Sequence, residues 1–464
     1  MSDSPFAPDT IAAIATAPGR GAVALLRVSG PGALGVLHRV APSVDGMNPR
    51  VQRLAALHHP ESGELLDRAL VTYFPAPASY TGEDTVEIST HGGVLTPQLV
   101  LDALLAAGAR AALPGEFTRR AYLNGKLDLL QAEAVADLID GRSRALHRAA
   151  VHQMERGLSR RIQELRAAII HTESLIAYSI DFPEEDEPPV PPERIRAAAA
   201  GVVARLDALL ATAPEGELLR DGALTVLAGR PNSGKSSLFN ALLGAERAIV
   251  TEIPGTTRDA LEAQASVDGY PFRLVDTAGL RETVDRVEGM GIEFARRYLA
   301  AADLVLFCVE AGRALQEDER AFLRTRDPER TLLVRTKADL LPVDGTAGTA
   351  DGETGSPGLC TVTVAAVEGT GLAGLRDALL RMAFGHVLAD PGEAPVVTRE
   401  RHARALRRAR DELAEFLAAL ADRVPMEFAA THLRAAAGAL EDLIGVVTVD
   451  DVLDRVFGDF CVGK

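Results

Sequence analysis

The stretch Gly229-Arg-Pro-Asn-Ser-Gly-Lys-Ser236 decides the fold of a large part of this chain. It follows the apolar residues Leu224–Ala228, which predict a strand, and it precedes a segment that predicts a helix. The spacing is that of the phosphate-binding P-loop, in which backbone N–H groups cradle phosphate oxygens at a helix N-terminus. Lys235 is expected to reach the β- and γ-phosphates, and the Ser236 hydroxyl is expected to bind Mg²⁺. The alternative is a chance glycine-rich turn, and the strand and helix on either side argue against it.

Three further motifs accompany this loop in the order expected of a GTPase. Asp276-Thr-Ala-Gly279 follows a predicted strand, and its aspartate is expected near Mg²⁺. In Thr336-Lys-Ala-Asp339, which follows another strand, Asp339 would accept hydrogen bonds from the guanine N1–H and 2-amino groups that adenine lacks. The stretch Thr251–Asp259 supplies Thr257 as the threonine that binds Mg²⁺ in the GTP state. The four motifs together predict a GTP-hydrolysing switch.

Three positions depart from the common GTPase pattern. Thr336 replaces the usual asparagine of the guanine motif, which keeps a hydroxyl but loses the amide contacts. Ala365-Ala366-Val367 stands where Ser-Ala-Lys is usual, so weaker guanine affinity is a possible consequence. Leu280 occupies the position at which many GTPases use glutamine to orient the attacking water. Acidic residues that follow and could replace it are Glu282, Asp285 and Glu288.

Two patterns alternate along the chain and predict a multidomain α/β plus α fold. From about residue 219, apolar strands alternate with helical segments, which predicts a mainly parallel sheet. These strands are expected at Leu224–Ala228, Phe272–Val275, Leu304–Val309, Leu332–Arg335 and Thr361–Val364. Before and after this unit, apolar residues recur at helical spacing, as in Leu158, Ile162, Leu165 and Ile169. An α/β GTPase unit therefore interrupts an all-helical one.

The N-terminal part predicts a separate α+β domain, with strands at Ala22–Val28 and Thr85–Ile88 and a helix at Leu95–Ala107. The stretch Asp181–Pro192 cannot continue a helix and is expected to be a linker or loop. We place the N-terminal domain at 1–124, the helical domain at 125–218 and 386–464, and the inserted Ras-like GTPase domain at 219–385.

The composition of the chain argues against some classes of function and favours one cellular compartment. The net charge is −16, from 49 basic and 65 acidic residues, which argues against broad coating of RNA. No apolar run approaches membrane-spanning length, and the first residues do not resemble a secretion signal, so no membrane is expected. Three cysteines without metal-like spacing suit the cytoplasm. Cys308 and Cys360 are expected in strands and in the core.

Lysine is rare in this chain: only four of the 49 basic residues are lysines. The simple cause is codon bias, under which lysine should persist where arginine cannot replace a compact charge on a flexible stem. Lys235 and Lys337 lie in the nucleotide motifs. Lys126 and Lys464 are therefore candidates for a second functional site.

The chain resembles the bacterial tRNA modification GTPases of the MnmE (TrmE) family. The stretches that carry the resemblance include Pro18–Gly21, Ser79–Asp84, His91–Gly93, Pro114–Phe117, Leu123–Asp128, Asp181–Asp186 and Phe460–Lys464. The resemblance implies a homodimer formed through an N-terminal folate-binding domain. It also implies a heterotetramer with the FAD-containing protein MnmG, which would install an aminomethyl or carboxymethylaminomethyl group at C5 of the wobble uridine of tRNA.

The resemblance also implies ligands and site residues. The one-carbon unit would come from 5-formyl- or 5,10-methylene-tetrahydrofolate, bound by Arg27, Glu87, Lys126 and Lys464. K⁺ would activate hydrolysis when the GTPase domains pair, held by Asn232, Thr251, Ile253 and Thr256. Glu288 would orient the attacking water in place of Leu280. Lys235 is a candidate catalytic group, and so is the near-terminal thiol of Cys461. The alternative for this cysteine is that it is a buried small apolar residue.

The residues expected to bind GTP and its metal ions fall in four groups, the last of which combines two segments. They are Asn232, Ser233, Gly234, Lys235, Ser236 and Ser237; Thr251, Glu252, Ile253, Pro254, Gly255, Thr256 and Thr257; Asp276, Thr277, Ala278 and Gly279; and Thr336, Lys337, Ala338, Asp339, Ala365, Ala366 and Val367. Among these, Ser236 and Thr257 are the expected Mg²⁺ ligands. Two other functions stay open: a ribosome-assembly switch that only controls RNA binding, and a folate-binding scaffold with a regulatory GTPase.

Overall fold

The structure is a computed structural model, and it describes residues 9–141, 143–181, 190–245, 262–276, 288–341, 358–389, 396–445, 450–458 and 460–463. The chain divides into two compact units. The first comprises Met1–Ala136 with Glu441–Lys464, and the second comprises Asp137–Leu440. The C-terminal segment thus belongs to the same unit as the N-terminal domain.

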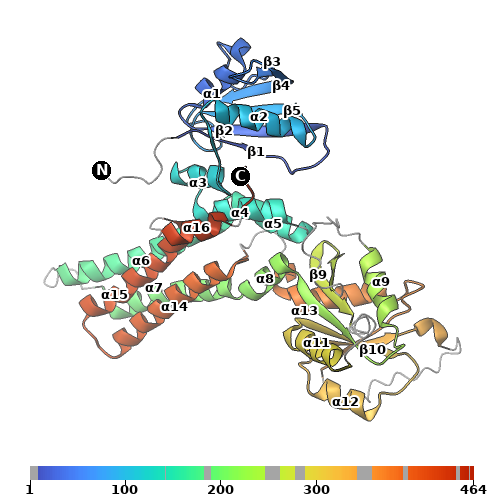
Figure 1. Cartoon of the computed structure of the whole chain (residues 1–464). Helices are drawn as coiled ribbons and strands as arrows, with labels where there is room; N and C mark the ends of the chain where they lie inside the picture. The colour runs from blue at the N-terminus through green and yellow to red at the C-terminus, as the bar shows by residue number, and fades with distance from the viewer. Residues whose placement is uncertain are drawn as a thin grey trace. The chain divides into compact units, whose positions relative to one another are not determined.

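The first unit is built on a sheet with strand order β3-β4-β5-β2-β1-β6 (Figure 1). Its strands are β1 (Ile11–Ile14), β2 (Val23–Ser29), β3 (Arg53–His58), β4 (Leu65–Phe74), β5 (Thr85–His91) and β6 (Arg110–Ala111). Neighbouring strands are antiparallel, except that β1 and β6 run parallel. Helices α1 (Ala33–Val40) and α2 (Leu95–Ala106) cover one face, and a 3-10 turn, η1 (Pro42–Val44), follows α1. The expected α+β domain is confirmed.

Alternation along β2 and β5 gives the sheet two different faces. Leu26, Val28 and Ile88 are buried against α1 and α2. Successive side chains of a strand point to opposite faces, so Arg27 and Glu87 lie on the other face. The two residues are direct partners in the β2–β5 register.

The C-terminal segment is held by helix α3 (Glu116–Leu123) and by the residues just before it. Arg119 Nη1 of α3 lies 2.7 Å from Asp454 Oδ1 of α16 (Asp450–Gly458). Val462 forms a bridge with Pro114, next to Gly115, whose φ is +65°. A Cβ at position 115 would lie 2.6 Å from the carbonyl oxygen of Phe457, so the close approach of the two segments requires glycine.

The helical part of the second unit is made of the long helices α6 (Gly157–Asp181), α7 (Pro192–Leu210), α14 (Glu400–Ala421) and α15 (Met426–Ile444) together with the shorter α5 (Arg144–Met154) and α8 (Ala213–Asp221). Helices α4 (Leu129–Asp140) and α15 each cross a boundary between the units. Helix α7 packs against α6 and α14 (Figure 1). Arg434 Nε of α15 lies 2.7 Å from Glu173 Oε1 of α6, and His432 Nδ1 of α15 lies 2.8 Å from Glu412 Oε2 of α14. The expected helical domain is confirmed as a bundle.

One stretch, Pro192–Asp221, is long and apolar enough to cross a membrane by length and composition, so the expectation that no such run exists is wrong. Its apolar residues Ile195, Val202 and Leu206 are buried at helical spacing. The stretch is also broken, because α7 ends at Leu210 and α8 begins at Ala213. Of the apolar window in this stretch 22% is buried, so α7 buries one face in the bundle and leaves the other residues at or near the surface.

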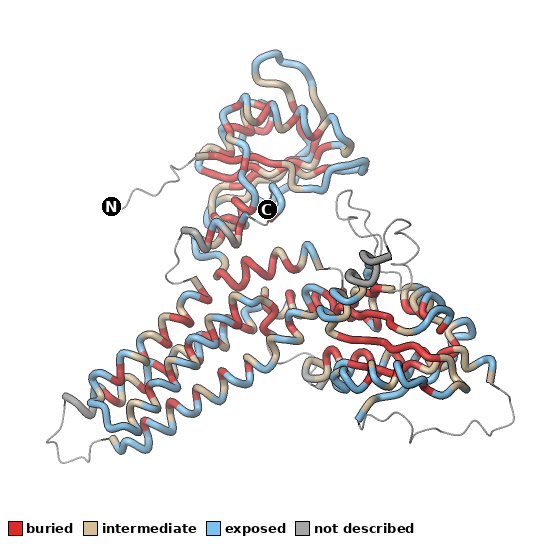
Figure 2. The backbone as a smooth tube through the Cα atoms, turned by 60° about the horizontal axis from the view of Figure 1, so that its bottom comes forward, coloured by how far each residue is buried: buried red, intermediate tan, exposed pale blue. Residues whose placement is uncertain are grey.

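The GTPase part of the second unit contains a sheet with strand order β12-β11-β10-β7-β9-β8. Its strands are β7 (Ala223–Ala228), β8 (Glu262–Val267), β9 (Tyr270–Asp276), β10 (Leu304–Glu310), β11 (Thr331–Thr336) and β12 (Cys360–Thr363). All neighbouring pairs are parallel except β8 and β9. Figure 2 shows that the central strands are buried along most of their length. The expected mainly parallel sheet is confirmed.

Helices cover both faces of this sheet. α9 (Lys235–Ala245) and α13 (Leu372–Ala389) pack on one face, and α11 (Glu288–Ala301) and α12 (Glu317–Arg324) on the other. Cys308 in β10 is buried as expected. Cys360 is exposed, so its expected place in the core is wrong. The reason is that β12 is the edge strand of the sheet.

Candidate nucleotide and N-terminal ligand sites

The loop between β7 and α9 has the backbone shape that a phosphate site needs. Gly229, Asn232 and Gly234 have φ angles of +141°, +61° and +82°. A Cβ at position 229 would lie 2.4 Å from the Cys308 carbonyl oxygen. Glycine is therefore required there, while asparagine tolerates the left-handed conformation at 232. Helix α9 starts at Lys235, so its N-terminal N–H groups point into the loop.

The polar side chains of the loop are oriented by their neighbours. Lys235 is 4% exposed, and its Nζ donates to the carbonyls of Gly229 (3.1 Å) and Arg230 (2.8 Å). The Ser236 hydroxyl donates to Asp276 Oδ2 at 2.9 Å. Hard oxygen ligands of this kind suit Mg²⁺, so Ser236 and Asp276 fit the metal that a bound nucleotide would bring. Bound Mg²⁺ would offset phosphate charge at this point.

Thr336 plays a part that its sequence position did not reveal. Its side chain is 1% exposed, and its hydroxyl donates to the Ser233 carbonyl at 2.7 Å, with the Val309 carbonyl oxygen at 3.3 Å. A Cβ added at Gly234 would lie 3.1 Å from Thr336 Cβ. The first residue of the guanine motif is thus packed under the phosphate loop.

The rest of the guanine motif lies at the ends of β11 and β12. Lys337 has φ +58°, and its Nζ forms an ion pair with Glu310 Oε1 at the end of β10. The hydrogen bond from Lys337 lowers the pKa of Glu310. The Ala338 N–H donates to the Val364 carbonyl at 3.1 Å, which places the exposed Asp339 beside the loop of Ala365, Ala366 and Val367. Parallel strands bring all these segments to one edge of the sheet.

An unexpected tether joins the phosphate loop to α12. Arg230 Nη2 lies 2.8 and 2.6 Å from the two carboxylate oxygens of Asp318. Arg230 Nε also lies 3.5 Å from Glu319 Oε1, and Glu319 is 2% exposed. Hydrogen bonds from Arg313 outweigh burial and lower the pKa of Glu319.

Several expected site residues lie outside the described residues. They are Thr251, Glu252, Ile253, Pro254, Gly255, Thr256, Thr257, Thr277, Ala278, Gly279 and Lys464, with Glu282 and Asp285. Glu288 is the first residue of α11, and its side chain is also outside the described part. Of the expected K⁺ ligands the structure describes Asn232, which is exposed in the phosphate loop.

On the face of the N-terminal sheet opposite α1 and α2, Arg27 and Glu87 form an ion pair. Arg27 Nε and Nη2 donate to the same oxygen, Glu87 Oε1, at 3.1 and 2.8 Å. The Arg27 side chain is 15% exposed and the Glu87 side chain is 27% exposed. Within the described part of the chain, Arg27 Nη1 and Glu87 Oε2 have no partner, so a ligand would meet both a donor and an acceptor here. This pair fits the site that the resemblance implied.

Lys126 comes to the same unit from the loop after α3. Its Nζ donates to the Pro77 carbonyl at 2.9 Å, and Gly82 packs against its stem. The Asn124 side chain donates to the Thr81 carbonyl at 2.7 Å. Lys126 is therefore tied to the loop between β4 and β5, and its ammonium group is exposed.

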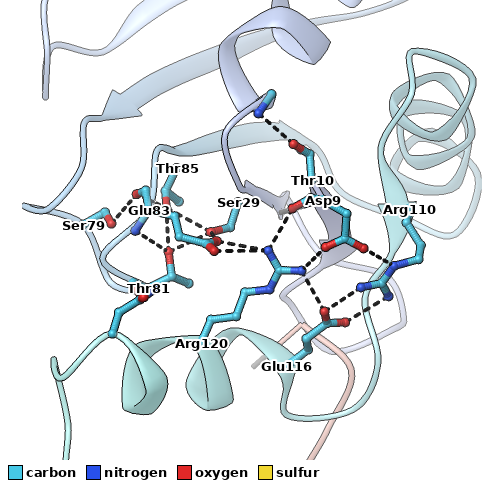
Figure 3. Close-up of polar contacts among 12 residues, drawn as sticks. Asp9, Thr10, Ser29, Ser79, Thr81, Glu83, Thr85, Arg110, Glu116 and Arg120 are labelled. Atoms are coloured by element: carbon cyan, nitrogen blue, oxygen red, sulfur yellow. Dashed lines mark hydrogen bonds and ion pairs between the residues drawn. The ribbon is translucent and has the colours of Figure 1, made fainter. Parts of the chain in front are cut away.

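Figure 3 shows a charged network at the base of this loop. Arg120 donates to Asp9 (2.5 Å), Glu116 (2.9 Å) and Glu83 (3.1 Å), and Arg110 donates to Asp9 and Glu116 at 2.7 Å each. Burial alone would raise the pKa of Glu116, but hydrogen bonds from Arg110, the Leu113 N–H and Arg120 outweigh it and lower the pKa. The same two arginines lower the pKa of Asp9 against its burial.

Comparisons with known proteins identify the family. The model described as "GTP-binding protein TrmE N-terminus" matches residues 10–126, and the model described as "MnmE helical domain" matches residues 129–461. A tRNA modification GTPase MnmE from Azoarcus sp. (strain BH72) is 44% identical over the whole of both chains. One from Moorella thermoacetica is 42% identical over 98% of this chain and 99% of its own. The chain belongs to the tRNA modification GTPase MnmE family.

Among solved structures, the G domain of the FeoB iron transporter of T. maritima is 27% identical and covers 34% of this chain and 97% of its own. The TM-score is 0.26, too low to carry an argument about shape. For this member of the MnmE family, the strand order of the GTPase sheet and the phosphate loop establish the GTPase fold.

Two features of this MnmE family member correct or extend what its sequence predicted. Cys461 is exposed, so the alternative that it is a buried apolar residue is wrong. Tyr80, Phe117 and Arg120, which surround the Arg27 site or its base, were not expected as site residues. Tyr80 and Phe117 lie within the stretches Ser79–Asp84 and Pro114–Phe117 that carried the resemblance, which is the signal that could have found them.

Proposed function

We propose that this chain is a GTP-hydrolysing enzyme of tRNA modification. With the FAD-containing protein MnmG, it would install a carboxymethylaminomethyl or aminomethyl group at C5 of the wobble uridine of certain tRNAs. The observation that carries the proposal is the combination, in one family member, of a phosphate loop with its guanine motif and a separate Arg27–Glu87 site. A simple switch protein needs the first site alone.

The GTPase part of the proposal assigns each described residue a task. The loop N–H groups and Lys235 would hold the phosphates, Ser236 and Asp276 would hold Mg²⁺, and Asp339 would select guanine. Thr257 would join the metal in the GTP state. The geometry of Ser236 and Asp276, with a 2.9 Å hydrogen bond between their oxygens, supports a shared ion.

The activation of hydrolysis is proposed to depend on K⁺ and on pairing of two GTPase domains. Asn232, with Thr251, Ile253 and Thr256, would hold K⁺ against the phosphates, where its charge would offset the charge that develops during hydrolysis. Glu288 would orient the water. Leu280 has no hydrogen-bonding side chain, which supports an acidic residue in that task.

The second ligand is proposed to be 5-formyl- or 5,10-methylene-tetrahydrofolate, bound by Arg27, Glu87, Lys126 and Lys464. Arg27 Nη1 and Glu87 Oε2, which have no partner among the residues that the structure describes, support a polar ligand on this sheet face. Gly463 packs against Ile14 at the end of β1, where a Cβ would lie 2.5 Å from the Ile14 carbonyl oxygen. Lys464 follows directly in the chain, and the exposed thiol of Cys461 is proposed to take part in the one-carbon chemistry.

The assembly and location are also proposals. We propose a homodimer through the N-terminal domain, a heterotetramer with MnmG, and action on tRNA in the cytoplasm without a membrane. The domain limits 1–124, 125–218 with 386–464, and 219–385 are proposed as the functional division of the chain.

Mass spectrometry of wobble uridines tests the function directly. A strain that lacks the gene should lose the modified uridine, and the wild-type gene should restore it. A Lys235→Ala variant should not restore it, because Lys235 is required for nucleotide binding. Unchanged modification in the deletion strain would favour the ribosome-assembly switch, while full rescue by Lys235→Ala would favour a folate-binding scaffold whose GTPase is only regulatory.

A further inference from the structure

Arg27 lies against two aromatic rings that come from different elements. Its Cζ is 5.2 Å from the centroid of the Tyr80 ring and 5.7 Å from that of the Phe117 ring. Tyr80 lies in the loop between β4 and β5, and Phe117 lies in α3. A guanidinium within about 6 Å of an aromatic centroid is attracted by the ring, more strongly when the pair is desolvated. With a side chain that is 15% exposed, Arg27 meets this condition.

Both rings are themselves held in place. Phe117 is fully buried with Ile11, Ala13 and Ala112. Tyr80 packs against this cluster, and its hydroxyl lies 2.9 Å from Thr118 Oγ1, the residue after Phe117. Both rings are therefore fixed to α3, Phe117 as part of the helix and Tyr80 through its contact with Thr118.

The loop that carries Tyr80 is tied to the same helix at a second point. Glu83 accepts a hydrogen bond from Arg120 of α3 at 3.1 Å and one from the Ser29 hydroxyl of β2 at 2.9 Å (Figure 3). Ser29 and Arg27 lie on the same face of β2, because they are two residues apart. The network thus links the strand that carries Arg27 to the loop that carries the ring.

Glu87 holds only one edge of the guanidinium. Both bonds from Arg27 go to Glu87 Oε1, so this oxygen alone would allow the guanidinium to pivot. An arginine side chain has several rotatable bonds, and ordering them costs free energy when a ligand binds. Contacts with fixed rings remove that freedom before the ligand arrives.

We propose that Tyr80 and Phe117 are positioning residues of the Arg27–Glu87 site, which hold the guanidinium so that its unused N–H donors meet a bound tetrahydrofolate. This inference rests on the proposed folate site and adds two residues that act on the ligand through Arg27. The aromatic ring of Tyr80 does the positioning, and its hydroxyl contributes only through Thr118.

Titration calorimetry of the full-length protein with 5-formyl-tetrahydrofolate tests the proposal. Tyr80→Leu should weaken binding roughly tenfold, because it removes the ring and keeps an apolar side chain. Tyr80→Phe should bind within about twofold of the wild type, since the ring stays. Phe322→Leu is the matched control, because it removes the ring that lies 4.6 Å from Arg326 Cζ in the other unit. It should leave folate affinity unchanged.

A double-mutant cycle separates positioning from a general effect on the fold. In an Arg27→Ala background, Tyr80→Leu should cause little further loss, because the ring acts through Arg27. An equal loss in both backgrounds would overturn the proposal, as would wild-type affinity of Tyr80→Leu or an equal loss in Tyr80→Phe. If the wild type itself does not bind 5-formyl-tetrahydrofolate, the proposed folate site fails and the positioning role with it. Binding by the wild type without an effect of the ring overturns the positioning role alone.

Discussion

The hydroxyl of Thr336 donates to the carbonyl oxygen of Ser233 at 2.7 Å, although the two residues are 103 positions apart in the chain. This bond joins the first residue of the guanine motif to the backbone of the phosphate loop. Both residues are buried, at 1% and 2% exposure. The first residue of the guanine motif therefore supports the phosphate loop.

Replacing Thr336 with valine removes this donor without a large change in volume. A buried acceptor that loses its partner costs about 1 to 3 kcal/mol, and here the cost falls on the loop that must hold the phosphates. We expect GDP and GTP affinity to fall between about fivefold and 150-fold in a fluorescent-nucleotide titration. Thr336→Ser should retain most of the affinity, because it keeps the hydroxyl.

Thr361→Val in β12 is the matched control, since Thr361 is exposed at the edge strand. It should bind nucleotide like the wild type. Normal affinity in Thr336→Val would show that the hydrogen bond to Ser233 does not support the loop.

Gly229→Ala should abolish nucleotide binding. The new Cβ would lie 2.4 Å from the Cys308 carbonyl oxygen, and the φ of +141° is strained for any side chain. Gly244→Ala in α9 has open space around the new methyl group, so it should be neutral or slightly stabilising, by about 0.5 to 1 kcal/mol. Thermal unfolding and nucleotide titration of the two variants give the comparison, and nucleotide binding by Gly229→Ala would contradict the assigned loop geometry.

Local patterns were enough to predict the phosphate loop and five of the six strands of the GTPase sheet, whereas β8 (Glu262–Val267) was missed. Alternating apolar strands and a glycine-rich turn before a helix depend on neighbouring residues, so they can be seen in the sequence. The bond between Thr336 and Ser233 depends on β11 and β7 ending at one edge of the sheet. From the sequence alone, the one inference about Thr336 was that it lacks the amide group of the asparagine usual at this position.

The N-terminal site also depends on contacts between distant residues, which local sequence patterns do not reveal. The resemblance pointed to Arg27 and Glu87, and the structure makes them register partners on one sheet face, 60 positions apart. The rings of Tyr80 and Phe117 could not be predicted around Arg27, because they come from a loop and a helix whose packing is a tertiary property. The prediction that Cys360 lies in the core was wrong for a related reason, since an apolar strand pattern does not show which strand lies at the edge of the sheet.

GTP hydrolysis should be faster in KCl than in NaCl at equal ionic strength. The proposed K⁺ site at Asn232 would use the larger ion to offset phosphate charge. Glu288→Ala should still bind GTP and should hydrolyse it at least about a hundredfold more slowly, because it loses the group that orients water. Equal rates in the two salts would remove K⁺ from the proposal, and unchanged turnover in Glu288→Ala would remove Glu288.

Lys126→Ala should weaken binding of 5-formyl-tetrahydrofolate and leave GDP affinity unchanged. The lysine lies in the first unit, and the phosphate loop lies in the second. Loss of a charged hydrogen bond corresponds to about 1.5 to 3 kcal/mol, or roughly 10- to 150-fold in affinity. Lys337→Ala serves as the opposite case, with nucleotide affinity reduced and folate affinity retained. A normal folate titration of Lys126→Ala would assign the lysine to its bond with the Pro77 carbonyl alone.

Lowering the pH should destabilise the first unit, because Glu116 becomes protonated. Its folded pKa lies below the ordinary value of 4.5, because the hydrogen bonds from Arg110, Leu113 and Arg120 outweigh burial. A carboxyl whose folded pKa is lowered stabilises the fold above its unfolded pKa, and this contribution is lost as pH falls through the folded pKa. Amide hydrogen exchange in β1 is the suitable measure, since a chain of two compact units need not unfold in one step.

Glu116→Gln should reduce β1 protection by about 3 kcal/mol at neutral pH, because two arginines lose a buried carboxylate. The difference between variant and wild type should shrink as pH falls below the ordinary carboxyl range, since the wild type then loses the same charge. Glu61→Gln, at an exposed loop position, should match the wild type at every pH. A Glu116→Gln deficit that stays constant down to acidic pH would mean that packing, rather than the charge of Glu116, holds Arg110 and Arg120 in place.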